Sequence, residues 1–422
     1  MPDTSRSSDE VPAKASYTKV LRNRSLFCLW LGQLVSRSGD FVFDVAIVWL
    51  VLRLTGSVVD VGLAIGTSQL PSVLVAPIAG VYVDRLNRRW LLVVSNAVQA
   101  GVCGVIAVAY AAGWAGFPVL LVLLFALNAA GQFTGGAVTA MLPRIVETSE
   151  LAAANGLFSV STSFNQLLGY GIGGIAILAL GPDVPIFYDA LTFVFALSMV
   201  SLIPRAYGSP AKEGEGAPTK RSFFESFTEG LSFIRANRIL IEVVALAVAA
   251  NFFGGAVGTL LAPYAKTALM GNASSYGFLL ASFSLGSIAG ALVTGKVNVR
   301  DHVGGILFGG LAATGVLVAL LGFATGLWEA LPLAVATGFF EAAINIPLQV
   351  LVQTKIPSTI LGRTIGTLGA LVGLTIPIAS FASGGVAAAL SIPVTFEVFG
   401  CLMAVTSAVA FISFRELRSA KY

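Results

Sequence analysis

Long apolar runs recur along almost the whole chain of 422 residues. An α-helix rises 1.5 Å per residue, so about 20 apolar residues cross the hydrocarbon core of a bilayer. Twelve runs reach that length, and only 11% of the residues are charged, against about 25% in soluble domains. The sequence therefore predicts an all-α polytopic membrane protein with twelve transmembrane helices. They are expected at residues 26–54, 58–83, 90–112, 117–141, 151–180, 185–204, 238–263, 274–297, 303–326, 328–353, 361–390 and 392–414.

The predicted helices form two sets of six that share residues at a fixed spacing. Five residues recur 215 positions later at equivalent places in the topology: Gly56 as Gly271, Gly62 as Gly277, Ser72 as Ser287, Gly80 as Gly295, and Arg85 as Arg300. Two pseudo-symmetric six-helix halves around a midplane site are typical of secondary transporters. We expect an N-terminal tail (1–24), a first bundle (25–204), a linker with an amphipathic helix (205–237), a second bundle (238–414) and a C-terminal tail (415–422).

Nearly all lysines and arginines fall on one side of this topology. The exceptions are Arg37, Arg53 and Lys266. Positive residues favour the cytoplasmic side of a membrane, so both termini are expected in the cytoplasm. No segment before Leu26 resembles the apolar core of a cleaved signal peptide. We therefore expect a multi-pass protein of the plasma (inner) membrane.

The first predicted helix carries three charged residues near its middle. Arg37, Asp40 and Asp44 are spaced by three, four and seven residues, which places them on one helix face. A charged side chain at this depth costs about 2.5–3.5 kcal/mol on insertion scales, so it normally faces a protein interior or a watery cavity. This face is a candidate functional site.

The segment between the second and third helices resembles the signature cytoplasmic loop of the major facilitator superfamily. The residues that match are Gly80, Asp84, Arg85, Arg88 and Arg89. Asn87 replaces the usual second glycine, and because asparagine tolerates positive φ, we expect the tight turn to be kept. The resemblance implies a gating role in which the loop pairs with the other half in the outward-open state. The second half keeps Gly295 and Arg300 but has Val299 in place of the acid.

The fifth helix is similar to the antiporter motif of drug exporters in this superfamily, Gly-Pro-x-x-Gly-Gly. Gly169, Gly173 and Gly174 match it, while Tyr170 replaces the proline. The alternative is that these small residues only allow close helix packing. Further residues resemble the macrolide-efflux branch of drug–proton antiporters, namely Leu31 to Ser36, Gly39 and Asp40, Thr55 to Ser57, and Asn155. The Gly39-Asp40 pair also resembles ferroportin-like metal exporters.

In the superfamily, helices 1, 4, 7 and 10 line the central cavity. The resemblance therefore implies that eight polar residues converge there: Arg37, Asp40, Asp44, Asn128, Gln132, Asn251, Glu341 and Asn345. Burial disfavours the charged form of a carboxyl group and a nearby arginine favours it. Because Arg37 faces two acids, we expect one of them, or Glu341, to hold a proton near neutral pH and release it when the cavity opens. The alternative is that Arg37 and Asp40 form a structural ion pair.

These features predict a proton-coupled exporter of amphipathic small molecules, such as drugs or macrolide-like natural products, rather than an enzyme. The expected partners are a small-molecule substrate and the lipid bilayer, without nucleic acid. We expect a monomer without a cofactor, with the proton as the coupling ion. With a single histidine, His302, and three cysteines in apolar runs, no metal site is expected. The alternatives are a metal or siderophore exporter and a non-transporting scaffold or sensor. Four acids near predicted helix ends are expected to be solvated or capping: Asp60, Asp189, Glu242 and Glu397.

Overall fold

A computed structural model of the chain describes residues 21–114, 116–209, 223–296, 302–357 and 359–420. The described residues are almost entirely helical. In chain order the helices are α2 (Arg24–Thr55), α3 (Val58–Leu74), α4 (Ala76–Arg85), α5 (Arg88–Ala111), α6 (Phe117–Ile145), α7 (Leu151–Leu180), α8 (Asp183–Ser201), α9 (Phe223–Ala236), α10 (Arg238–Thr267), α11 (Ala273–Lys296), α12 (Val303–Phe323), α13 (Leu327–Lys355), α14 (Leu361–Gly373), α15 (Thr375–Leu390), α16 (Ile392–Ser413) and α17 (Arg415–Arg418).

Membrane-length segments in the described residues agree with the predicted number. Ten segments are long and apolar enough to span a bilayer, and one of these ten consists of α14 and α15 together. The bent pair α3 and α4, taken as one span, is the eleventh. The remaining segment, α2, has 32 residues, and its apolar character is interrupted by Arg37, Asp40 and Asp44. Counting α2 gives twelve spans, as the apolar runs predict.

Two of the spans are interrupted where proline lies in the first turn of the following helix. Pro77 follows the break between α3 and α4, where the chain bends by 43°. Pro377 follows the break between α14 and α15. Proline lacks an N–H group and clashes with the carbonyl group four residues earlier, which accounts for both breaks. By contrast, α13 continues as one helix through Pro347.

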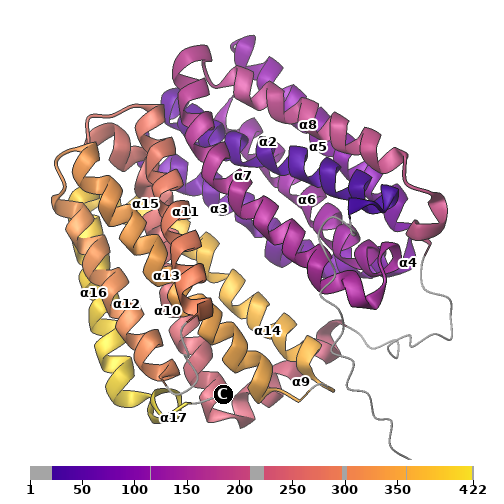
Figure 1. Cartoon of the computed structure of the whole chain (residues 1–422). Coiled ribbons are helices and arrows are strands. Elements are labelled where there is room, and N and C mark those ends of the chain that lie inside the picture. The colour runs from indigo at the N-terminus through magenta and orange to yellow at the C-terminus, as the bar shows by residue number, and fades with distance from the viewer. Residues whose placement is uncertain (1–20, 115, 210–222, 297–301, 358, 421–422) are drawn as a thin grey trace, which may run out of the picture.

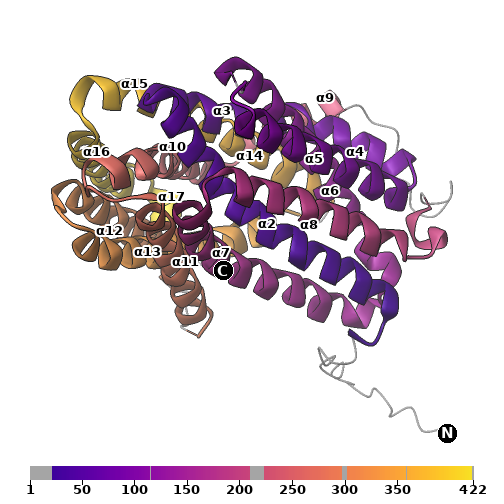
Figure 2. The same cartoon turned by 90° about the horizontal axis from the view of Figure 1, so that it is seen from above.

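The spans form two bundles that meet at one end (Figure 1). Helices α2 to α8 make up the first half and α10 to α16 the second, and α7 packs against α11 while α3 packs against α15 (Figure 2). A Cβ atom built onto Gly62 would lie 2.5 Å from the Ser380 carbonyl oxygen, and one built onto Gly277 would lie 2.5 Å from that of Tyr170. Gly62 and Gly277 are partners in the sequence repeat, so the repeated glycines make equivalent contacts between the halves.

We call the end with these contacts the closed end. The opposite end carries α4, α9 and α17, and the two halves spread apart toward it (Figure 1). We call it the diverging end. The two halves are therefore in contact at one end and apart at the other, an asymmetry expected of two bundles that rock about a midplane site.

Replacing Gly174 with valine should disturb the closed end. A Cβ atom built there would lie 2.7 Å from the Ala273 carbonyl oxygen and 3.0 Å from the Cα of Ser274, which belongs to the other half. The halves must separate to admit the side chain, so we expect the population to shift toward conformations open at this end.

Spin labels at Ser57 and Ser391, on the two sides of the α3 and α15 contact, would report the separation. Gly171→Val is the matched control, because a Cβ atom at Gly171 meets only Ala281 of the described residues, at 3.9 Å. Identical label distances in the wild type and both variants would contradict the expectation.

The amphipathic helix predicted in the linker is α9, and it packs on the second half. Arg363 of α14 donates a hydrogen bond of 2.7 Å to Glu229 of α9. Ile234 is buried in a cluster with Leu240, Ile356 and Leu368. Several predicted parts lie outside the described residues: linker residues 210–222, the tail up to residue 20, and Val299 and Arg300 of the second gating-loop copy.

Glu242 takes the capping role, one of the two expected for acids near helix ends. Its side chain is buried, with an exposed fraction of 4%. It accepts hydrogen bonds from Arg238 Nε at 3.3 Å and from the backbone N–H of Leu417 at 2.8 Å. Glu242 is therefore not solvated; it caps the first turn of α17 and ties the C-terminal segment to α10.

Candidate functional site

A cavity of about 600 Å³ lies between the two halves. We call it the central cavity. Its lining comes from both halves and includes five of the eight predicted site residues: Arg37, Asp40, Asp44, Asn128 and Gln132. The charged face of α2 therefore points into a cavity at the interface of the two bundles, where an ionisable group has access to water.

The charges of α2 are unevenly matched. Arg37 Nη1 lies 3.3 Å from Asp40 Oδ2, and their side chains are 48% and 28% exposed. Asp44, one turn further along, is accessible from the cavity and forms no ion pair or hydrogen bond with any described residue. Arg37 thus pairs with one acid and leaves the other without a direct partner.

Asp189 of α8 is a third acid in this cavity, and its expected solvated position is wrong. Its side chain is only 1% exposed. Cys103 Sγ donates to Oδ2 at 3.4 Å, and Thr192 Oγ1 donates to Oδ1 at 3.1 Å. A Cβ atom built onto Gly39 would collide with Asp189 Oδ1 and with Thr192 Oγ1. Gly39 therefore lets α8 approach α2 closely enough to place Asp189 beside Asp40. This packing role of Gly39 was not recognised from the sequence, although it would have indicated that Asp189 is buried.

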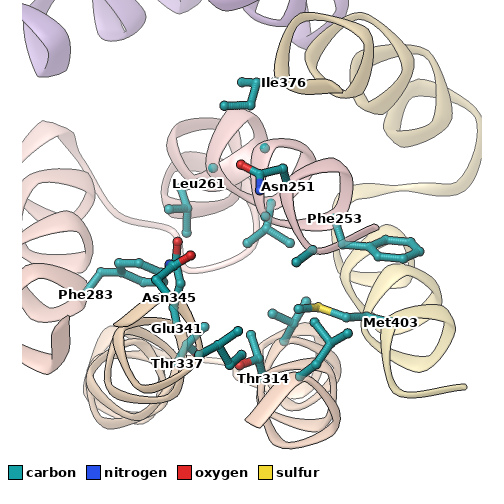
Figure 3. Close-up of a pocket in the computed structure, with 18 of the residues that line it drawn as sticks. Asn251, Phe253, Leu261, Phe283, Thr314, Thr337, Glu341, Asn345, Ile376 and Met403 are labelled. Atoms are coloured by element: carbon teal, nitrogen blue, oxygen red, sulfur yellow. The ribbon is translucent and has the colours of Figure 1, made fainter. Parts of the chain in front are cut away.

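The other three predicted residues line a separate cavity of about 270 Å³ inside the second half (Figure 3). We call it the C-terminal-half cavity. Asn251 of α10 and Glu341 and Asn345 of α13 point into it, and its walls include Phe253, Phe283 and Met403 (Figure 3). The structure therefore divides the eight residues between two cavities, where the sequence predicts one.

The two cavities adjoin along α10. Both are lined by Gly255, Gly258, Leu280 and Ile376. A Cβ atom built onto Gly258 would meet no described atom within 4 Å. The glycines of α10 therefore place no side chain between the two cavities.

Glu341 is the one acidic group of the C-terminal-half cavity. It forms no hydrogen bond or ion pair with any residue that the structure describes. The hydroxyl groups of Thr314 and Thr337 donate to backbone carbonyl groups of their own helices at 2.9 and 2.7 Å. A carboxyl group in an apolar, aromatic cavity without a fixed positive partner suits either a proton or an organic cation.

The predicted gating loop is the turn between α4 and α5 at the diverging end. Asp84 and Arg85 are exposed, Arg88 is buried, and Arg89 Nη2 donates to the Ser201 carbonyl oxygen at 2.7 Å. Gly80 lies inside α4 with no described atom within 4 Å of a built Cβ. The acid of the loop thus faces solvent at the end where the halves are apart.

Asn87 forms the turn in a different way from the one expected. Its φ is −66°, so the backbone does not need the positive φ that asparagine tolerates. Its side chain instead accepts a hydrogen bond of 3.1 Å from the Trp90 N–H and caps the start of α5. An asparagine therefore replaces the family's glycine by serving as an N-cap.

If the loop has the gating role that the resemblance implies, Asp84 makes a contact with the other half in the opposite state. Replacing Asp84 with asparagine should then weaken this contact and slow the conformational cycle by roughly fivefold. Substrate selectivity should not change, because Asp84 lines none of the described cavities. Turnover can be measured in proteoliposomes with several substrates, and Glu147→Gln, an exposed acid at the same end, is the control. An altered substrate spectrum with normal turnover would contradict this role.

The glycines of the fifth-helix motif lie at helix contacts. Gly169 and Gly173 of α7 face α2, where built Cβ atoms would lie 2.7 Å from Phe41 Cβ and 3.2 Å from Val42 Cα. Gly174 faces α11 across the closed end. Close helix packing, the alternative to an antiporter motif, thus accounts for glycine at all three positions.

No group of three or more His, Cys, Asp or Glu side chains in the described part of the chain is arranged to hold a metal ion. His302 is exposed before α12.

Solved structures share this architecture. The nucleoside transporter NupG aligns with a TM-score of 0.70 and 13% identity over 93% of this chain and 100% of that chain. A bacterial homologue of the human lysosomal transporter Spinster aligns with a TM-score of 0.69 and 16% identity over 94% of this chain and 98% of that one. At these identities the likeness shows the fold alone.

Sequence relatives cover nearly the full length. The multidrug efflux pump Tap of Mycolicibacterium fortuitum is 25% identical over 397 residues, 91% of this chain and 94% of that protein. The MFS-type transporter YvqJ of Bacillus subtilis is 21% identical over 402 residues, 94% of each chain. Residues 15–421 match the family described as transmembrane secretion effector. The chain belongs to this family and is a membrane transporter of the major facilitator superfamily.

Proposed function

We propose that this transporter exports amphipathic small molecules, such as drugs or macrolide-like natural products, in exchange for protons. The observation that carries the proposal is the pair of adjoining cavities, each with an acid that has no direct positive partner. Asp44 faces the central cavity and Glu341 faces the C-terminal-half cavity. If proton and substrate compete for these carboxyl groups, binding of one releases the other, and opposite gradients are coupled.

The cavity walls support the substrate class. In the C-terminal-half cavity, aromatic and aliphatic side chains surround one acid and two amides, Asn251 and Asn345. Such a lining favours apolar molecules that carry one positive or polar group. The efflux pump Tap is among the relatives, which supports export over import.

The proposed orientation places both termini in the cytoplasm of the cell and the protein, as a monomer, in the plasma (inner) membrane. In this orientation the diverging end faces the cytoplasm, and the structure corresponds to the state that loads substrate. The gating loop with Asp84 would then pair with the second half only after the transporter reorients.

Proton release on substrate addition tests the proposal. The purified protein in weakly buffered detergent solution would receive tetraphenylphosphonium, erythromycin or Mn²⁺ in turn, and a pH indicator would follow proton release. We expect release with an organic compound. Release with Mn²⁺ alone would favour a ferroportin-like metal exporter, and no proton release with any of the three would count against exchange.

The Gly39-Asp40 pair does not favour the metal exporter, because Gly39 has a packing role against α8.

A further inference from the structure

A third cavity, of about 240 Å³, lies in the first half between α2, α6 and α7. We call it the vestibule. It shares Arg37 and Gly135 with the central cavity. Its other residues extend toward the diverging end, where α6 ends and α7 begins. A molecule that enters at this end can therefore occupy the vestibule and the central cavity together.

Five side chains that line the vestibule donate to main-chain carbonyl oxygens at 2.7 to 3.0 Å: Thr139, Asn155, Ser161, Thr162 and Asn165. Ser161 Oγ also accepts a hydrogen bond from Trp30, whereas the side-chain oxygens of the other four accept none from any described residue. These oxygens are therefore available as acceptors, and no carboxylate is among the residues that line the vestibule.

Gln33 adds a donor without a partner. Its side chain is 7% exposed, and its Nε2 atom is buried with no hydrogen-bond partner among the described residues. It lies one turn before Arg37 on α2 and lines the vestibule. A buried donor without an acceptor is costly, so an oxygen atom of a ligand would satisfy it.

Aromatic side chains complete the vestibule. Trp30 donates from its indole N–H to Ser161 Oγ at 2.9 Å, which fixes the ring at the wall, and Phe158 also lines the cavity. Flat apolar rings beside hydrogen-bonding groups suit a ligand that is itself part apolar and part polar.

We propose that the vestibule binds an uncharged, hydroxyl-bearing group, such as a sugar, attached to an amphipathic substrate. A hydroxyl group donates to the free acceptor oxygens and accepts from Gln33. An ammonium group has no acceptor for Gln33, and a carboxylate has no donor for the acceptor oxygens. Arg37, the charged residue in the described lining of the vestibule, is already paired with Asp40. At about 240 Å³ the vestibule is smaller than a typical drug pocket of about 300–1,000 Å³, so it holds one part of the molecule. This proposal rests on the proposed function and defines its substrates as glycosides.

The test compares glycosides with their aglycones. Binding of digitoxin and its aglycone digitoxigenin, and of etoposide and its aglycone 4′-demethylepipodophyllotoxin, whose sugars carry no charge, would be measured by calorimetry on the full-length protein in detergent. In the wild type we expect the glycoside of each pair to bind more tightly. Gln33→Met, which keeps the volume and removes the donor, should weaken glycoside binding by about threefold to tenfold and leave aglycone binding unchanged.

Gln349→Met is the matched control, since Gln349 is exposed on α13 and lines none of the three cavities. Equal weakening of glycoside and aglycone, unchanged binding in Gln33→Met, or no preference for glycosides in the wild type would overturn the sugar site. Aglycones that bind and release protons without such a preference would still support the proposed exporter. Failure of all four compounds to bind would count against both.

Discussion

Glu341→Gln is expected to abolish transport driven by a pH gradient. Glutamine keeps the size and hydrogen-bonding capacity of the side chain but can neither release a proton nor carry a negative charge. Glu341 is the one acid lining the C-terminal-half cavity, and no described residue pairs with it. Loss of one charge contact of about 1.5–3 kcal/mol corresponds to a fall in coupled transport of at least about tenfold. Uptake of labelled substrate into proteoliposomes with an acidic lumen measures the effect.

Glu329→Gln is the matched control for this variant. Glu329 lies on the same helix, at its first turn, where it accepts hydrogen bonds from Thr325 and lines none of the three cavities. It should transport like the wild type. If Glu341→Gln retains full uptake driven by the pH gradient, Glu341 has no part in coupling.

Gly39→Val is expected to damage both folding and transport. A Cβ atom at this position would collide with the side chains of Asp189 and Thr192, and Asp189 is itself fixed by Cys103. Overpacking of a dense helix contact typically costs about 1–3 kcal/mol, and two collisions with buried polar atoms favour the upper end. The helices must separate, which displaces Asp189 from the central cavity. We expect a lower unfolding temperature in detergent and reduced coupled transport.

Gly101→Val on α5 provides the comparison, because a Cβ atom there meets no described atom within 4 Å. Its unfolding temperature should match that of the wild type. A Gly39→Val protein with unchanged stability and transport would show that the close approach of α2 and α8 is not required.

The helices were predictable because their apolar runs are long and bounded by clear turns. Residues 151–180, for example, coincide with α7 as Leu151–Leu180. The break next to Pro77 was not predicted, although the missing N–H group of proline accounts for it and for the break next to Pro377. Helix spacing correctly placed Arg37, Asp40 and Asp44 on one face, since that depends on residues of a single helix.

What remained hidden depends on contacts between helices. Asp189 was misplaced because its burial follows from the contact of α8 with Gly39, 150 positions away along the chain. The division into two cavities depends on how α10 packs against its neighbours. The spacing of apolar residues along the sequence does not predict that packing. Gln33 looks like an ordinary polar residue in the sequence, and only the positions of α6 and α7 show that its amide lacks a partner.

The most direct test of proton-coupled export is substrate accumulation in proteoliposomes whose lumen is more acidic than the outside. Labelled tetraphenylphosphonium and erythromycin would be offered with the gradient intact and with the gradient collapsed by nigericin in potassium buffer. The account predicts accumulation against a concentration gradient that disappears when the pH gradient is collapsed. Accumulation that is the same with and without the pH gradient would contradict it.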